Sequence, residues 1–363
     1  MPQIVYIDIT ATATEAPNNL QGTGAIVSVG GTNLTDGSYQ LITSVSDFTA
    51  IASTASGEVY NCVNSFYQQG EGSVYVLELG AGATLSDALN TYIQANPKTF
   101  YAYLLGASAA SDSGLVTMAK NYVNQNSMTY FFLDCTYAQA QTFANIKSVA
   151  TFIPSPSAVA TEIDAGGAFY ELINANPNST KKLAPFAFRY MYGKTPWAEK
   201  GNAAQFARMK SLFANFIGTG AQGGVSEDIL FWGYFMDGKP MSYWYAVDWV
   251  QIHLAQDLAY EIITGSNNTT NPLIYDQRGI TRLQARALST LSNGVNYGCI
   301  ISSPTVAAVD FGTYIAANPT DYSTGTYNGL SATIEPMRGF EQITFYLNVD
   351  FTGAAAATTT TTG

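Results

Sequence analysis

The stretch LIYDQRGITRLQARALSTLSNGVNYGCI, residues 273–300, carries two helical patterns at once. Apolar residues recur at the spacing of a helix that packs one face on a core, namely Ile280, Leu283, Ala287, Leu288 and Leu291. A second face carries three arginines at four-residue intervals, Arg278, Arg282 and Arg286, which we call the arginine ridge. The segment predicts a long helix with one packed face and one charged face, and such a ridge is either a solvated surface or a binding surface.

Charge is scarce elsewhere in the chain. Only 11% of the 363 residues are charged, against roughly 25% in an average soluble domain, whereas 13% are aromatic. A surface of this kind suits a protein that works inside an assembly. The length allows two domains, or one domain with a large insertion.

The net charge of -11 is unevenly distributed. Residues 1–180 hold three of the fifteen basic residues but thirteen acidic ones, and the remainder holds twelve and thirteen. An acidic first half is a poor surface for nucleic acid, so we expect no nucleic-acid partner. We interpret the first half as facing solvent and the second half as facing neighbouring subunits.

Cysteines and hydropathy indicate no further class of site. The isolated Cys62, Cys135 and Cys299 lie in apolar surroundings and are expected to be buried free thiols. No run of 18 apolar residues occurs, so we expect no membrane partner.

Each end of the chain contains an amphipathic segment with the period of a β-strand. Near the start, Val5, Ile7 and Ile9 point to one side of the predicted strand and Tyr6 points to the other. Near the end, the apolar residues at alternate positions are Ile343, Phe345, Leu347, Val349 and Phe351. Neither segment has a hairpin partner beside it in the sequence. We therefore expect these terminal strands to add to an exposed sheet edge of a neighbouring chain. After Gly353 a low-complexity tail follows, which we expect to be flexible.

The middle of the chain alternates between helix and strand. Four helices are predicted at 59–69, 85–94, 113–125 and 137–146, and four strands at 73–79, 99–105, 129–135 and 149–154. Continuous apolar strands between helices indicate a parallel or mixed sheet covered on both faces. From about residue 200 helices dominate, with helices at 202–218 and 246–263 and a hairpin at 229–245 that turns at Asp237-Gly238. The predicted class is α/β, or α+β for the whole chain.

Two segments resemble phosphate-binding motifs but depart from them. Gly193-Lys194-Thr195 looks like the end of a phosphate loop, yet Phe188 stands where its first glycine should be and Pro196 blocks the helix. Gly80 and Gly82 follow a strand, but Leu85 replaces the third glycine of a dinucleotide fingerprint.

Catalytic and metal-binding patterns are equally weak. The single histidine, His253, lies four residues before Asp257, a spacing that is more often structural than catalytic. Trp232, Trp244, Tyr245 and Trp249 form an aromatic cluster that is more typical of a core than of a cofactor site. We predict no enzymatic activity, no cofactor and no metal site.

The order of elements in residues 237–300, a short hairpin, a helix with an Asp-Trp pair, a loop, and then YDQRGI opening a second helix, resembles the C-terminal half of contractile tail sheath proteins of myophages. The closing strand at 343–351 is similar to that family's last strand. The resemblance covers roughly residues 225–351 and the N-terminal strand.

This resemblance implies a structural function. Such sheath subunits form stacked six-fold rings around an inner tail tube, exchange terminal strands with their neighbours, and contract to drive the tube through the host envelope. Expected partners are further copies of the chain, the tube protein, and baseplate and tail terminator proteins. The expected location is the virion, after assembly in the host cytoplasm.

The resemblance also implies a division of the chain. A sheath domain would combine the strand in residues 1–20 with residues 201–340, residues 21–200 would form an inserted outer α/β domain, and residues 341–363 would be the C-terminal strand and tail. The arginine ridge would face an acidic tube or another subunit. The sheath of a related injection machine, such as a bacteriocin particle or a secretion system, is the alternative. A small-ligand-binding or degenerate α/β enzyme is a remote one.

Overall fold

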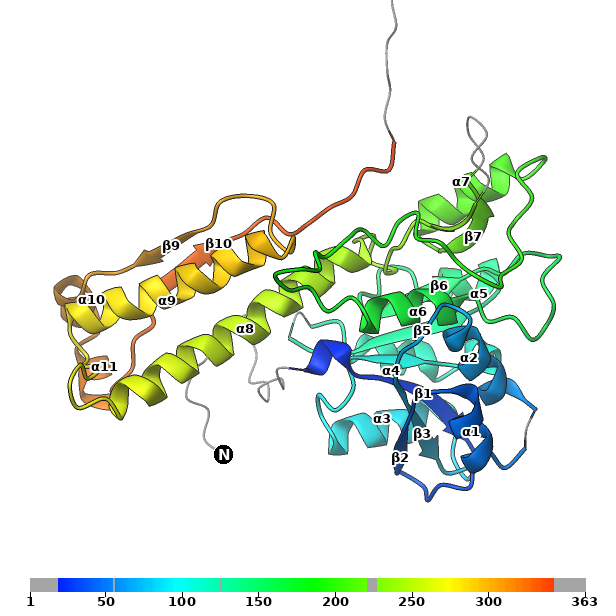
Figure 1. The fold of residues 1–363 in the computed structure, drawn as a ribbon, viewed down its shortest axis with the longest axis horizontal. Coiled ribbons are helices and arrows are strands. Elements are labelled where there is room, and N and C mark those ends of the chain that lie inside the picture. Colours follow the sequence, from blue (N-terminus) through cyan, green and yellow to red (C-terminus); the bar gives the residue numbers. More distant parts are fainter. Residues whose placement is uncertain (1–18, 55, 125, 221–226, 343–363) are drawn as a thin grey trace, which may run out of the picture.

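The computed structural model describes residues 19–54, 56–124, 126–220 and 227–342. The chain forms a body, residues 19–240, from which a helical extension, residues 241–335, projects to one side (Figure 1). The body contains a six-stranded sheet with helices on both faces, and the extension is built mainly from two long helices. The predicted mixed α/β class is confirmed.

The sheet has the strand order β2-β3-β1-β4-β5-β6. Its strands are β1 (Gly24–Val29), β2 (Tyr39–Ile42), β3 (Val74–Leu79), β4 (Ala102–Leu104), β5 (Tyr130–Asp134) and β6 (Val149–Phe152). All pairings are parallel except that of β2, which runs antiparallel to β3 at one edge. The four strands predicted in the middle of the chain are present, whereas β1 and β2 were not predicted.

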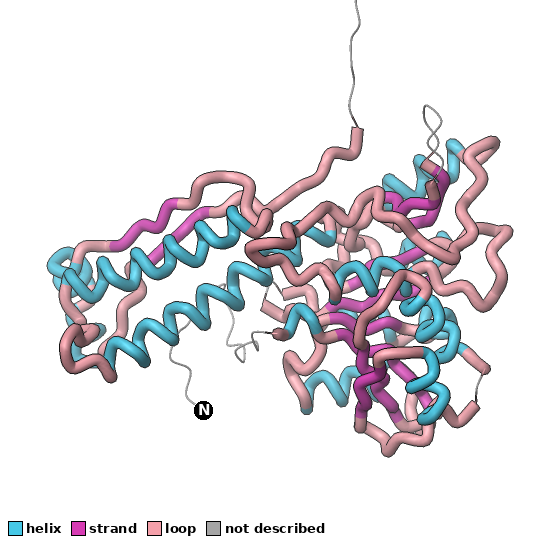
Figure 2. The backbone as a smooth tube through the Cα atoms, viewed as in Figure 1, coloured by secondary structure: helices cyan, strands magenta, loops and turns pink. Residues whose placement is uncertain are grey.

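The helices of the body cover both faces of this sheet (Figure 2). They are η1 (Leu20–Gly22), α1 (Val45–Ile51), α2 (Glu58–Tyr67), α3 (Leu85–Ala95), η2 (Ala107–Ser111), α4 (Leu115–Lys120), α5 (Tyr137–Thr142), α6 (Ala165–Ile173) and α7 (Ala203–Leu212). Successive strand residues enter different cores: Phe132 packs in one apolar cluster and Phe131 in another. This two-sided burial explains why the strands are continuously apolar.

A two-stranded sheet, β7 (Phe216–Thr219) and β8 (Asp228–Phe231), continues the body beyond β6. Ile153, Met209 and Phe216 share one apolar cluster there. The elements α7, β7 and β8 therefore pack with the sheet. The helix predicted at 202–218 is too long, because Phe213 takes a left-handed conformation after α7 and β7 follows.

The extension begins with α8 (Met241–Ser266) and α9 (Gln277–Asn296), which lie side by side. Beyond them lie α10 (Phe311–Ala317), α11 (Pro319–Thr324) and the antiparallel pair β9 (Thr305–Ala308) and β10 (Leu330–Thr333), with β9 packed against α9. The hairpin predicted at 229–245 is wrong in its second half, because residues 241–245 open α8. Its turn is correct, since Gly238 has a positive φ of 81° and Tyr234 bridges to Pro240. None of the helices in the described part of the chain has the length and apolar character needed to cross a membrane.

Candidate assembly surface

The N-terminal part of α8 is fixed to the sheet by a buried carboxylate. Asp248 Oδ2 accepts hydrogen bonds from the hydroxyls of Tyr101 and Tyr130, at 2.8 and 2.7 Å, and Asp248 is fully buried. Burial raises the pKa of Asp248, while the charge of Lys147 and the two tyrosine hydroxyls act in the opposite direction. Lys147 lies over the Trp244 ring, 4.3 Å from its centroid. The extension is thus joined to β5 and the residue preceding β4 by polar bonds inside the core.

The aromatic cluster predicted around α8 is largely core. Trp244, Tyr245 and Trp249 are buried, and His253 stacks on Trp249 at a centroid distance of 3.9 Å. His253 Nδ1 lies 2.8 Å from the Trp249 carbonyl oxygen, and burial lowers the pKa of the imidazole. These contacts hold the His253 ring against its own helix, so the role of His253 is structural.

The start of α9 explains the YDQRGI sequence. Asp276 is the N-cap: its Oδ1 accepts from the Gly279 N–H at 2.9 Å, and its Oδ2 accepts from Arg278. A side chain at Gly279 would place a Cβ 1.9 Å from the Ile274 carbonyl oxygen, so the preceding loop closes onto the helix only because this residue is glycine. The Arg278 side chain is 85% exposed.

The other two members of the arginine ridge face α8. Arg282 forms an ion pair with Glu261 and donates to the Asn271 carbonyl oxygen at 3.0 Å. Arg286 pairs with Asp257 at 2.5 Å, and the second oxygen of Asp257 accepts from Thr290. The ridge is therefore divided: two arginines join the long helices, and Arg278 projects into solvent.

The sheet formed by β9 and β10 has one edge that the extension itself engages and one that is exposed. The Val309 N–H donates to the Gly329 carbonyl, so these two residues form a hydrogen-bonded pair. Hydrogen-bonded and non-hydrogen-bonded pairs alternate along an antiparallel ladder. The opposed residues Val306 and Ala332 are therefore a non-hydrogen-bonded pair, and their backbone N–H and C=O groups point away from the partner strand. On the β9 side the Val306 carbonyl accepts from Gln284 of α9 at 2.7 Å. On the β10 side Ala332 is exposed, and within the described ranges no hydrogen bond reaches its outward backbone groups. Backbone groups left unpaired at an exposed strand make this edge suited to a further strand.

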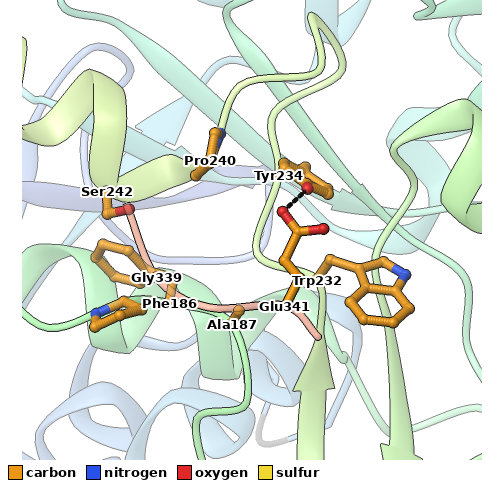
Figure 3. A pocket seen from close by; sticks show the side chains of 9 residues that line it. Phe186, Ala187, Trp232, Tyr234, Pro240, Ser242, Gly339 and Glu341 are labelled. Carbon is orange, nitrogen blue, oxygen red and sulfur yellow. Dashed lines mark hydrogen bonds between the residues drawn. The ribbon is translucent and has the colours of Figure 1, made fainter. Parts of the chain in front are cut away.

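The terminal-strand residues predicted from the sequence lie outside the described residues. These are Val5, Tyr6, Ile7, Ile9, Ile343, Phe345, Leu347, Val349 and Phe351. The last described residues, 336–342, run back from the extension to the body, where Glu341 accepts a hydrogen bond from Tyr234 (Figure 3).

The phosphate-motif look-alikes are parts of the packed body. Lys194 is buried and donates to Gln68 at 3.3 Å, and Gly80 lies in a turn between β3 and α3. Glu78, at the end of β3, accepts from Ser28, from the Gly30 N–H and from Thr32. The Glu78 carboxylate thus joins the loop after β1 to β3. Across the described ranges no group of three or more His, Cys, Asp or Glu side chains is arranged to hold a metal ion.

The three cysteines are buried free thiols, as expected. The interhelical carboxylates and the tyrosines around Asp248 were not predicted. A signal for the former exists, because Asp257 and Glu261 are four residues apart and so match the spacing of Arg282 and Arg286.

No family model and no curated protein matches the sequence. Among solved structures, the chain is similar to a chain of the helical sheath of the anti-feeding prophage in its contracted state, with a TM-score of 0.62, 14% identity, and coverage of 96% of this chain and 100% of the other. A chain of the anti-feeding prophage baseplate gives a TM-score of 0.64 at 14% identity, over 95% and 98% of the two chains. The sheath tail protein from Listeria innocua gives 0.58 at 9% identity, over 90% and 93%. These similarities extend over both the body and the extension, and the chain has the fold of contractile tail sheath proteins.

Proposed function

We propose that this protein is the subunit of a contractile tail sheath, which polymerises as stacked six-fold rings around an inner tube. The observation that carries the proposal is the extent of the similarity, because 95–96% of this chain is covered by sheath and baseplate chains of one contractile particle. On this proposal the partners are further copies of the chain, the tube protein, and baseplate and terminator proteins. The particle would be a phage tail, assembled in the host cytoplasm and carried in the virion.

The similarity to anti-feeding prophage chains favours a second candidate, the sheath of a related injection particle. Both candidates require the same assembly chemistry. The two terminal strands of each subunit would pair with sheets of neighbouring subunits, and the exposed outer edge of β10 is the recipient that the geometry favours. Arg278 is the ridge residue available for contact with the tube or another subunit.

Electron microscopy of the purified protein in negative stain, alone and with the tube protein, tests the proposal. Striated hollow cylinders are expected in at least one mixture, and small uniform particles in both would contradict the sheath function.

Ala332→Pro tests the recipient edge. Proline removes the outward N–H of residue 332 without removing a bond to β9, so the chain should fold but form no cylinders. Ala332→Ser keeps the N–H and should assemble like the wild type. Normal cylinders from Ala332→Pro would exclude this edge.

Arg278→Ala tests the exposed member of the ridge. It should weaken tube-dependent assembly at low salt, where charge contacts are strongest, and leave folding intact. Unchanged sheath length and yield would remove Arg278 from the contact.

A further inference from the structure

Residues 335–341 connect the extension to the body. The Ile301 N–H donates to the Glu335 carbonyl at 3.0 Å, and the Met337 N–H donates to the Cys299 carbonyl at 2.9 Å. Met337 is buried in the same apolar cluster as Cys299. Gly339 then crosses the body at Pro185, where an added Cβ would lie 2.6 Å from the Pro185 Cβ. The backbone is therefore anchored on the extension side and held close to the body at Gly339.

Glu341 ends this crossing beside Tyr234, to which it is hydrogen-bonded (Figure 3). Its carboxylate accepts from the Tyr234 hydroxyl, and lies 3.3 Å from Arg338 Nη2 and 3.6 Å from Lys210 Nζ. Lys210 also lies over the Trp232 ring, 4.0 Å from its centroid. Burial alone would raise the pKa of Glu341, but the bonds from Tyr234 and Arg338 and the nearby cations outweigh it and lower the pKa. The carboxylate is therefore ionised at neutral pH.

Beyond Met337, the apolar residue of the segment, Phe340, takes no part in the attachment. Phe340 is 82% exposed, whereas the neighbouring Glu341 side chain is only 21% exposed. Charge and hydrogen bonds, not apolar burial, hold the last part of the segment on the body. Partly exposed ion pairs are individually weak and are screened by salt, so this attachment can open and close.

We propose that residues 336–342 form a releasable strap, in which Glu341 acts as the clamp that fixes where, and in which direction, the C-terminal segment leaves the molecule. The strap holds when Glu341 is bound to Tyr234 and Lys210 of the body, and it loosens beyond Met337 when these contacts are broken. The pair of Glu341 with Arg338 lies within the strap and sets its local conformation. The consequence for assembly rests on the proposed sheath function, because it requires that the C-terminal strand reach a neighbouring subunit. The strap itself is a property of the single chain.

Trypsin measures the strap directly, because it cleaves after Arg338 and removes residues 339–363. Glu341→Gln should speed this cleavage at low salt by about fivefold or more, since cleavage follows the open population. Glu335→Gln makes the same charge change in the same segment outside the clamp, and should cleave like the wild type. At high salt the wild type should approach the rate of Glu341→Gln. Equal rates for all three proteins at low salt would overturn the proposal.

Tyr234→Phe provides a second variant, because it removes one hydroxyl without altering charge. It should increase hydrogen exchange in residues 338–342 and leave exchange in β5 unchanged. Unchanged exchange in the strap would contradict the clamp.

If the wild type forms cylinders, the cylinders formed by Glu341→Gln should be shorter or less regular. Identical cylinders from a variant with a loosened strap would refute the part of the strap in assembly. Absence of wild-type cylinders would count against the sheath function, whereas the proteolysis result would still decide the strap.

Discussion

Asp164 is a fully buried carboxyl group whose two oxygens have no hydrogen-bond partner among the described residues. Burial, followed by the charge of Asp134, raises its pKa well above the ordinary value. A native pKa above the unfolded one gives stability that is complete below the unfolded pKa and is lost as the pH rises through the native pKa. Asp164→Asn has no such proton to lose. Its free energy of unfolding should therefore fall less than that of the wild type as the pH rises from about 4, the unfolded pKa of an aspartate, towards the raised native pKa.

Urea unfolding across this pH range measures the difference. Asp87→Asn, at an exposed position on α3, makes the same chemical change at the surface and is the matched control. Equal slopes for Asp164→Asn and the wild type would mean that Asp164 does not hold its proton in the folded chain.

Gly279 makes a second residue-scale prediction. Alanine normally favours a helix, but at this position its Cβ would overlap the Ile274 carbonyl, so Gly279→Ala should lower the free energy of unfolding by about 1–3 kcal/mol. Ser289→Ala, exposed on the same helix, should change it by less than about 0.5 kcal/mol. Thermal or urea unfolding compares them, and a neutral Gly279→Ala would show that the loop before α9 can move aside.

At the scale of elements, the contact between α8 and α9 depends partly on ion pairs. A double-mutant cycle of Arg286→Ala and Asp257→Ala should give a coupling energy of about 0.5–1 kcal/mol, because both side chains are partly exposed. The same cycle on Arg278 and Asp276 should give a smaller coupling, since Arg278 is almost fully solvated. Equal couplings would mean that the two pairs have similar surroundings in solution.

These elements also show what the sequence can predict. The apolar runs of β3, β5 and β6 and the periodic pattern of α9 identify their structures, because local period and burial agree there. Spacing alone placed three arginines on one face of α9, but a helical face does not reveal which neighbour packs on it. The start of α8 was missed because MSYWY has the composition of a strand, and its helical state depends on packing against the body.

At the scale of the molecule, the terminal strands should be needed for assembly and not for folding. Deleting residues 1–16, or residues 343–363 with Glu341 retained, should leave a cooperatively folded chain that forms no cylinders. Circular dichroism and size-exclusion chromatography report folding, and electron microscopy reports assembly. A deletion that unfolds the chain would show that the strand completes a sheet of its own subunit.

The division of the molecule could be predicted only in outline. The alternation of strands and helices indicated an α/β body, and the change to long helices indicated a second part. The packing of α7, β7 and β8 with the body could not be predicted, because it depends on contacts such as that of Phe152 with Asn215, which are distant in sequence. The proposed recipient edge on β10 depends on hydrogen-bond alternation in three dimensions and has no sequence signal.

The anchoring of α8 at Asp248 has a mechanical consequence. The helix contains 26 residues and is therefore roughly 39 Å long, and its body-side end is fixed by two tyrosine hydroxyls. From Asp248 to Ser266 the helix rises roughly 27 Å, so a tilt of about 10° at Asp248 would move the far end by about 5 Å, close to one turn of a helix. The extension therefore acts as a lever: a small rotation of the body produces a larger displacement of the far end, which carries α10 and α11. The stiffness of the contact at Asp248 sets how much of that rotation is transmitted.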